Sequence, residues 1–410
     1  MLKIADVVGI EVLDSRGNPT VCAQVTLSNG SRGVAIAPSG ASTGKYEALE
    51  LRDEETQRYG GKGVLKAVKN INTTIKNALC KTNTVEQYKI DEYLCEIDGT
   101  ENKENLGANA MLAVSMALSR AAADFYNIPL YKYLGGAFKK RMPIPMMNIL
   151  NGGVHAANNV DIQEFMIVPI GAESISEAVR WGSEIYHTLG KLLNSKGLAA
   201  GVGDEGGFAP NVESDREALS FICEAIRTAG YSFSDVSVAL DVAASEWYHE
   251  DKYYMPKRGI YAGSMDICTT MDELIEDFPI ISVEDPLSED DWEGWCRMTD
   301  ILGDKVRLVG DDLFVTNSKR LTKGIKLGAG NSVLIKPNQI GTVTETLSVI
   351  NLAKQNRYTP IISHRSGESE DTFIADLSVA VGAEFIKSGA PCRTDRTAKY
   401  NRLIAIEQSI

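Results

Sequence analysis

Short apolar runs that end in a charged or polar residue recur along the second half of the chain. Six of them, VALD, ISVE, RLVGD, VLIK, IISH and EFIK, end in turn at Asp241, Glu284, Asp311, Lys336, His364 and Lys387. Continuous apolar runs of this length are typical of parallel strands buried on both faces. The segments between them, such as TETLSVINLAKQ, have helical spacing. Strands that alternate with helices predict an α/β barrel of the TIM type.

The chain before these runs has a different pattern. IADVVGIEVLDSRGNPTVCAQVTLSNG indicates two strands joined by a turn at Ser15–Pro19. LGANAMLAVSMALSRAAADFY is apolar or small on nearly every face and predicts a buried helix. The glycines, basic cluster and prolines of GGAFKKRMPIP mark a boundary. We therefore expect an α+β domain over 1–134 and a barrel over 135–410, with MNILNGG and EFMIVP as its first strands.

The polar ends of the apolar runs indicate an active site. In a barrel of this type the carboxyl ends of the strands build the site, and six charged or polar ends in succession suggest convergence. Asp241, Glu284 and Asp311 would lie on neighbouring strands. Three carboxylates repel one another unless a hard cation lies between them, and all-oxygen ligands suit Mg²⁺. The alternative is an ion-pair network with the lysines.

Cationic residues at the same end indicate an anionic substrate. We expect Arg365 and Ser366 to open a helix whose first turn is GESED, where a phosphate would bind; the acids there could instead only cap the helix. Mg²⁺ and Lys387 would lower the pKa of Lys336 and make it a base for a proton next to a carboxylate, with the metal stabilising the resulting enediolate. The alternative is a lysine whose stem merely packs in the barrel.

Three glycine-rich segments complete the candidate site. NGGVHAANNVDIQEF contains His155, Gln163 and Glu164, and GVGDEGGFAPN contains Glu205. Glu164 and Glu205 could form a carboxyl pair in which one pKa is raised, providing an acid opposite Lys336. PSGASTGKYEA lacks the spacing of a nucleotide P-loop and is better explained as a lid over the site.

Composition limits the partners. The net charge of -13 argues against nucleic acid and anionic membrane surfaces, and no apolar run approaches the length of a membrane span. Seven scattered cysteines and the absence of a secretion signal in MLKIADVVGIEV predict reduced thiols and a cytoplasmic location.

Ten segments in order, from PSGASTGKYEALELRD through NILNGGVHA, GDEGGFAPN, SVEDP and IKPNQIGT to IKSGAP, resemble the signature blocks of enolases. This resemblance implies reversible dehydration of 2-phospho-D-glycerate to phosphoenolpyruvate in glycolysis, with Mg²⁺ at two sites. It also implies a small capping domain, a barrel with an irregular ββαα start, and a homo-oligomer, either a dimer or an octamer.

The resemblance implies roles for individual residues. Lys336 would be the base, Glu205 the acid and Glu164 its partner, and Lys387 and His155 would also take part in catalysis. Asp241, Glu284 and Asp311 would bind one Mg²⁺, and Ser42 of the lid would help to bind a second. The substrate would contact Gln163, Glu164, His155, Arg365, Ser366, His364, Lys387 and Ser42. Val154, Ala157 and Pro337 depart from the family pattern, whereas every position assigned to chemistry is present.

Two alternatives remain open from the sequence. One is a different reaction of the enolase superfamily, although GDEGGF stands where those relatives tend to carry a Lys-x-Lys pair. The other is a protein that keeps the enolase fold mainly for binding. The presence of Lys336, Glu205 and the three carboxylates argues against the second.

Overall fold

The N-terminal part of the chain is an antiparallel sheet covered by helices. The computed structural model describes residues 2–40, 44–54, 56–137, 141–153 and 158–410. The sheet has the order β1 (Ile4–Leu13), β2 (Pro19–Leu27), β3 (Arg32–Ile36). The helical segments that follow are α1 (Leu65–Asn70), a π-helical turn (Ile71–Ile75), α2 (Lys76–Leu79), α3 (Gln87–Asp98), α4 (Ala108–Phe125) and α5 (Leu130–Gly135).

Helix α4 is the predicted buried helix, and it packs directly on the sheet. Its small residues allow a close approach: a Cβ atom added at Gly33 of β3 would lie 2.0 Å from the backbone oxygen of Ala117. The turn at 14–18 also lies where the sequence predicts it. This part therefore forms around one apolar helix that is covered on nearly every side.

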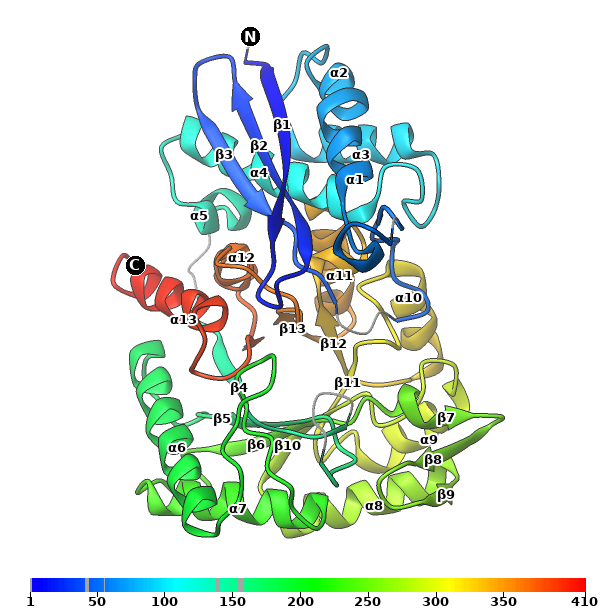
Figure 1. Ribbon diagram of the computed structural model, residues 1–410, viewed down its shortest axis with the longest axis vertical. Coiled ribbons are helices and arrows are strands. Elements are labelled where there is room, and N and C mark those ends of the chain that lie inside the picture. The colour runs from blue at the N-terminus through cyan, green and yellow to red at the C-terminus, as the bar shows by residue number, and fades with distance from the viewer. Residues whose placement is uncertain (1, 41–43, 55, 138–140, 154–157) are drawn as a thin grey trace.

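The C-terminal part is a closed barrel of eight strands (Figure 1). Neighbouring strands follow the order β10-β11-β12-β13-β14-β4-β5-β6. Their bounds are β4 (Ile144–Asn151), β5 (Glu164–Val168), β6 (Ser237–Asp241), β10 (Ile280–Glu284), β11 (Arg307–Gly310), β12 (Ser332–Ile335), β13 (Thr359–Ser363) and β14 (Phe385–Lys387). All neighbours are parallel except β5, which is antiparallel to both β4 and β6. The eight predicted strands are all present.

Helices surround this barrel, and their order explains the irregular start. Two strands, β4 and β5, precede two helices, and single helices alternate with strands from there on, apart from a small sheet (β7 Tyr248–His249, β8 Lys252–Met255, β9 Ile260–Ala262) after β6. The helices are α6 (Ile175–Ser195), α7 (Asp215–Thr228), α8 (Ser264–Asp277), α9 (Trp292–Leu302), α10 (Ser318–Leu327), α11 (Val343–Gln355), α12 (Phe373–Val381) and α13 (Thr394–Glu407). The structure confirms the barrel with the ββαα start.

Apolar side chains fill the interior of the barrel. They form one cluster: Met146, Met166, Val168, Ala239, Val309, Leu334, Ile361 and Phe385. Because the interior is packed, the polar residues at the strand ends gather at the mouth rather than along a channel. Among the helices of the described ranges, none combines the length and the apolar character needed to cross a bilayer.

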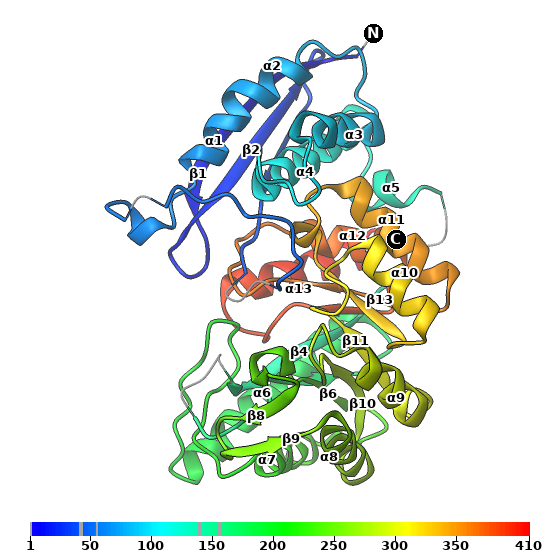
Figure 2. The ribbon, with the colours of Figure 1, turned by 90° about the vertical axis from the view of Figure 1, so that its right-hand side faces the viewer.

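The N-terminal part lies at one end of the molecule and contacts the mouth side of the barrel (Figures 1 and 2). The segment after β3 pairs with the segment after β13, through an isolated bridge between Ser39 and Gly367. The turn after β1 also contributes, because the Ser15 amide donates to Glu368 O at 2.6 Å. The two parts therefore enclose the space above the strand ends.

The segment that begins at Arg365 is not the helix that the sequence predicts. Residues 364–372 are irregular, and α12 begins only at Phe373. The Glu368 carboxylate accepts the Arg365 amide at 3.1 Å, and Gly367 pairs with Ser39. Since these contacts satisfy the backbone without helical hydrogen bonds, the expectation of a helix N-terminus at Arg365 and Ser366 was wrong.

An ion pair that is largely shielded from solvent joins the two parts of the chain, and it carries a prediction for stability. Arg120 of α4 donates to both carboxylate oxygens of Asp371, at 2.6 and 2.7 Å. We expect Arg120→Met to lower the free energy of unfolding by about 3–5 kcal/mol, because the buried Asp371 charge would lose its partner. Urea unfolding measures this change. Arg297→Met, which removes an exposed pair within α9, is the matched control and is expected to change little.

The same pair predicts a pH dependence. Burial raises the pKa of Asp371, but the Arg120 guanidinium outweighs burial and holds the pKa below its ordinary value. A lowered pKa stabilises the fold above the unfolded-state value of about 4, and this stabilisation is lost as the pH falls further. The stability difference between wild type and Arg120→Met should therefore shrink at acid pH, and a constant difference would contradict this account.

Candidate active site

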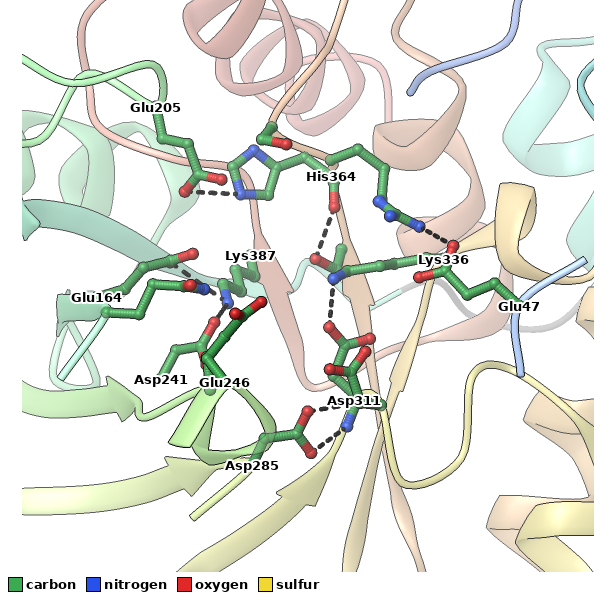
Figure 3. Close-up of a pocket in the computed structure, with 16 residues that line it drawn as sticks. Glu47, Glu164, Glu205, Asp241, Glu246, Asp285, Asp311, Lys336, His364 and Lys387 are labelled. Atoms are coloured by element: carbon green, nitrogen blue, oxygen red, sulfur yellow. Dashed lines mark hydrogen bonds and ion pairs between the residues drawn. The ribbon is translucent and has the colours of Figure 1, made fainter. Parts of the chain in front are cut away.

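A pocket lies at the mouth of the barrel, where the strand ends meet the N-terminal part (Figure 3). It encloses about 560 Å³, including its open mouth. Eight carboxyl groups and three cationic side chains line it: Glu47, Glu164, Glu205, Asp241, Glu246, Asp285, Asp311 and Asp312, with Lys336, Arg365 and Lys387. Such an excess of carboxyl groups in a buried site requires bound protons or cations.

Lys387 connects three of the strand ends. Its Nζ lies 2.8 Å from Asp241 Oδ2, 2.9 Å from both oxygens of Glu284, and 3.3 Å from Glu164 Oε2. Burial lowers the pKa of Lys387, but the surrounding carboxylates outweigh it and raise the pKa well above its usual value. Lys387 therefore stays charged and holds these carboxylates together.

Lys336 lies between the end of β12 and the 3₁₀ turn Pro337–Gln339. Pro337 suits the first position of such a turn, because its missing N–H has no partner to lose there. Lys336 Nζ bonds to Asp311 Oδ2, and Gln339 Nε2 donates to Asp311 Oδ1 at 2.9 Å. The turn therefore places both side chains on the same carboxylate.

The pKa of Lys336 is raised, which is opposite to the sequence-based expectation. Burial lowers this pKa, but the charge of Asp311 outweighs burial. Burial likewise raises the pKa of Asp311, and Lys336 overcomes it, so the Asp311 pKa is lowered. The side chains alone form an ion pair. A cation that neutralised Asp311 would remove the main cause that raises the pKa of Lys336.

Three buried carboxylates stand on neighbouring strands at the mouth. Asp241 and Glu284 are the last residues of β6 and β10 and are directly paired in register, and Asp311 follows β11. Burial and the Asp241 charge raise the pKa of Glu284 well above its usual value. Only lysine ammonium groups contact the three carboxylates as counter-charges among the described residues. This donor set, all oxygen and poor in counter-charge, fits a hard divalent cation.

A second group of acids lies beside this trio. Ligand oxygens of Asp285, Asp311 and Asp312 lie within 4.8 Å of one another, so Asp311 belongs to both groups. Asp285 accepts the Asp311 and Asp312 amides at 2.9 and 2.7 Å, and thereby shapes the turn. Burial, then Asp311, raises the pKa of Asp312 to about 8. The acids of this group could hold a metal ion, with Asp285 also serving as a backbone acceptor.

Glu164 and Glu205 form the predicted carboxyl pair. Glu164 is the first residue of β5, and the reversed direction of that strand brings it to the mouth of the barrel. Burial, then the Glu205 charge, raises the pKa of Glu164 well above its usual value. Glu205 lies in the loop before α7, where Asn148 Nδ2 donates to Oε2 at 3.2 Å. Glu164 therefore holds a proton more readily than an ordinary carboxyl group does.

His364, Arg365 and Ser366 follow β13 and line the pocket. Burial lowers the pKa of His364 well below its usual value, so its imidazole is neutral, and Nε2 lies 3.6 Å from Glu205 Oε2. Arg365 NH1 lies 2.7 Å from Glu47 Oε2. Burial lowers the pKa of Arg365, but Glu47 outweighs it and raises the pKa. The Arg365 guanidinium group, which lines the pocket, is therefore charged.

The structure places most of the predicted site residues in one pocket. Gln163 lines the pocket, and its backbone N–H donates to the backbone oxygen of Asp241 at 3.0 Å. Glu284 is not among the residues that line the pocket, but its carboxylate accepts a hydrogen bond from Lys387, which does line it. Four residues from the sequence analysis lie outside the described residues: Ser42, Val154, His155 and Ala157.

Sequence reasoning missed several residues of the site. Asp285 and Asp312 each follow a predicted ligand, so the doubled acids in VEDP and VGDD were a usable signal. Glu47 stands in the predicted lid segment, but nothing local marks it as the partner of Arg365. Arg396 of α13 bonds to His364 Nδ1, and its position in a helical pattern carried no such signal.

Comparison with known families agrees with this geometry. Residues 4–134 match the enolase N-terminal domain, and residues 139–410 match the enolase C-terminal TIM barrel domain. Both matches agree with the small sheet and the closed barrel described above. Since together they span nearly the whole chain, this protein belongs to the enolase family.

Proposed function

We propose that Lys336 and Glu205 carry out the two proton transfers of the enolase reaction, the reversible dehydration of 2-phospho-D-glycerate to phosphoenolpyruvate. One observation supports this assignment above the others. Lys336 and the Glu164–Glu205 pair line the same pocket from opposite sides, with Lys387 between them and with Asp241 and Asp311 below (Figure 3). A base and an acid on opposite faces of a substrate are what removal of H⁺ and OH⁻ from adjacent carbons requires.

Lys336 is the proposed base for the proton on C2. Its Nζ reaches the pocket beside Asp311, and its stem is fixed by the turn after β12. Arg365 and Lys387 are charged and lie near it, and both favour its neutral form. When bound at the carboxylate trio, Mg²⁺ would stabilise the enediolate and reduce the hold of Asp311 on Lys336.

Glu205 is the proposed acid for the hydroxide that leaves C3. The neighbouring Glu164 has a raised pKa, so it holds a proton that the two carboxyl groups can share. The Asn148 amide donates to Glu205 Oε2 at 3.2 Å, and His364 Nε2 lies 3.6 Å from the same oxygen. The acid therefore faces the pocket with a proton available to the leaving group.

Further features of the proposal rest on the family resemblance. The charged Arg365 and the neighbouring Ser366 are the proposed contacts for the substrate phosphate, with Arg365 exchanging Glu47 for the phosphate. Binding of a second Mg²⁺ with help from Ser42, participation of His155, assembly into a homo-oligomer and a role in glycolysis also belong to this proposal.

An ultraviolet assay tests the function directly. Purified protein mixed with 2-phosphoglycerate and Mg²⁺ is expected to show the absorbance rise of phosphoenolpyruvate, and EDTA is expected to reduce the rate to background, because the carboxylate trio would lose its cation. Restoring Mg²⁺ should restore the rate. No rise at saturating Mg²⁺ and substrate would mean that the chain does not catalyse the reaction.

A further inference from the structure

We propose that Arg396 is a positioning residue: it holds His364 in the neutral tautomer protonated on Nε2, and thereby turns the imidazole N–H toward the Glu205 carboxyl group. This inference rests on the proposed role of Glu205 as the acid. Arg396 lies in the first turn of α13, and its side chain is fully buried. Its contacts join three segments that surround the acid.

The guanidinium of Arg396 is fixed by backbone oxygens. NH1 donates to Arg365 O at 2.5 Å, and NH2 donates to Ser366 O at 2.6 Å and to Asp204 O at 3.3 Å. Its Nε lies 2.7 Å from Asp395 Oδ2. Arg396 therefore ties the loop of the acid to the segment after β13.

The contact between Arg396 and His364 determines the tautomer. NH1 of Arg396 bonds to Nδ1 of His364. A guanidinium only donates hydrogen bonds and keeps its protons at any ordinary pH. Nδ1 must therefore be the acceptor, and the one proton of the neutral imidazole lies on Nε2. This is the nitrogen that faces Glu205 Oε2, at 3.6 Å.

The tautomer in turn decides which group of His364 faces Oε2 of Glu205. His364 Nε2 lies 3.6 Å from Oε2, and the Asn148 side-chain amide donates to the same oxygen at 3.2 Å. An oxygen that faces two N–H groups is stabilised in its unprotonated form. Arg396 therefore acts on Glu205 through the imidazole that faces Oε2.

The packing of Gly389 supports the same arrangement. Gly389 lies after β14 with φ +77, and a Cβ atom there would lie 2.7 Å from Arg396 Cδ and 2.9 Å from Glu205 O. Only a glycine leaves room for the Arg396 side chain beside the backbone of the acid. The Ala390 amide also donates to Glu205 O at 2.9 Å.

The charges around His364 agree with a neutral ring. Burial is the main cause that lowers its pKa, the Glu205 charge opposes it, and Arg396, Lys387 and Lys336 add to the lowering. Removal of Arg396 would take away one of these lowering charges as well as the hydrogen bond that fixes the tautomer. The imidazole would then gain a proton at a higher pH than in the wild type.

Histidine ¹⁵N spectroscopy tests the tautomer without relying on catalysis. The chain has four histidines, so His364→Gln assigns the relevant signals by their disappearance. In the wild type we expect Nδ1 of His364 to have the shift of an acceptor nitrogen and Nε2 that of a protonated one. The reverse pattern, or a charged ring at neutral pH, would overturn the proposal whatever the Arg396 variants do.

Two variants of Arg396 then connect the tautomer to the reaction. Arg396→Met removes the hydrogen-bond donor to His364 Nδ1. It is expected to lower kcat by about 10- to 100-fold, with a smaller change in KM, because Glu205 would be misplaced. The acid limb of the kcat–pH profile should move to higher pH. Arg396→Lys keeps a donor at this position and should recover part of the rate.

A matched control separates positioning from mere stability. Lys399 is another fully buried cation of α13, and it donates to Ser369 O and Asp395 O, both at 2.6 Å, without contacting His364. Lys399→Met is expected to lower stability but to leave the tautomer and the pH profile unchanged. Identical pH profiles for Arg396→Met and Lys399→Met would contradict the proposal.

A double-mutant cycle checks that Arg396 acts through His364. In a His364→Gln background, Arg396→Met should cost much less in kcat than it does alone. Equal costs in both backgrounds would show that Arg396 acts on Glu205 by another route. If the tautomer is as proposed but Glu205→Gln retains full activity, the proposed role of the acid fails while the Arg396–His364 contact stands.

Discussion

Lys336→Ala is expected to lower kcat for the dehydration by about 10³- to 10⁴-fold, which is the upper range for loss of a general base. The alanine has no group that can reach the C2 proton. The variant would also leave the Asp311 charge without its ion pair, so Mg²⁺ binding should be kept or strengthened. A loss of rate with intact metal binding is therefore the signature of a missing base rather than of a damaged site.

The measurement that isolates this step is exchange of the C2 proton of 2-phosphoglycerate with deuterated water, followed by NMR. The wild type should exchange this proton, and Lys336→Ala should not. Lys191→Ala, which changes an exposed lysine of α6, is the matched control and should behave as the wild type. Exchange at the normal rate in Lys336→Ala would show that another group removes the proton.

Glu205→Gln is expected to lower kcat by about 10²- to 10⁴-fold while leaving the C2 exchange in place. The amide keeps the shape of the side chain but cannot transfer a proton to the leaving hydroxide. The wild-type arrangement also relies on Oε2 as an acceptor for Asn148, and a glutamine oxygen at that place preserves the contact. The first step therefore continues, and the second becomes slow.

The rates of dehydration and of C2 proton exchange in the Glu205→Gln variant are compared in a single sample. Dehydration is followed by the absorbance of phosphoenolpyruvate, and exchange is followed by loss of the C2 proton signal. Glu213→Gln, which changes an exposed acid before α7, controls for the substitution itself. If exchange falls by the same factor as dehydration, Glu205 is required for the first step, and its assignment as the acid for the second step is wrong.

Much of the barrel was predictable because its signals are local. Each apolar run ends where its strand ends, and the residue at that point lies at the mouth whether or not the rest of the fold is known. This explains why Asp241, Glu284 and Lys387 could be placed from the sequence. The closed order of eight strands and the buried α4 follow from the same kind of pattern.

Other predictions failed where distant residues determine the local structure. GESED has the composition of a first helical turn, but Ser39 of the N-terminal part pairs with Gly367, and Glu368 turns back to the Arg365 amide. The helix begins later as a result. Asp285 and Glu47 were missed for a related reason, since their partners lie on other strands and in the other part of the chain.

The sequence by itself determined the strand ends, the domain type and the kinds of side chain at the mouth, because hydrophobic periodicity and residue chemistry need no long-range information. Only the tertiary structure decided which ammonium group meets which carboxylate, in which direction the pKa of Lys336 moves, and which nitrogen of His364 carries the proton. These properties depend on burial and on distances of a few ångströms between residues far apart in the chain, where Coulomb interactions are strongest.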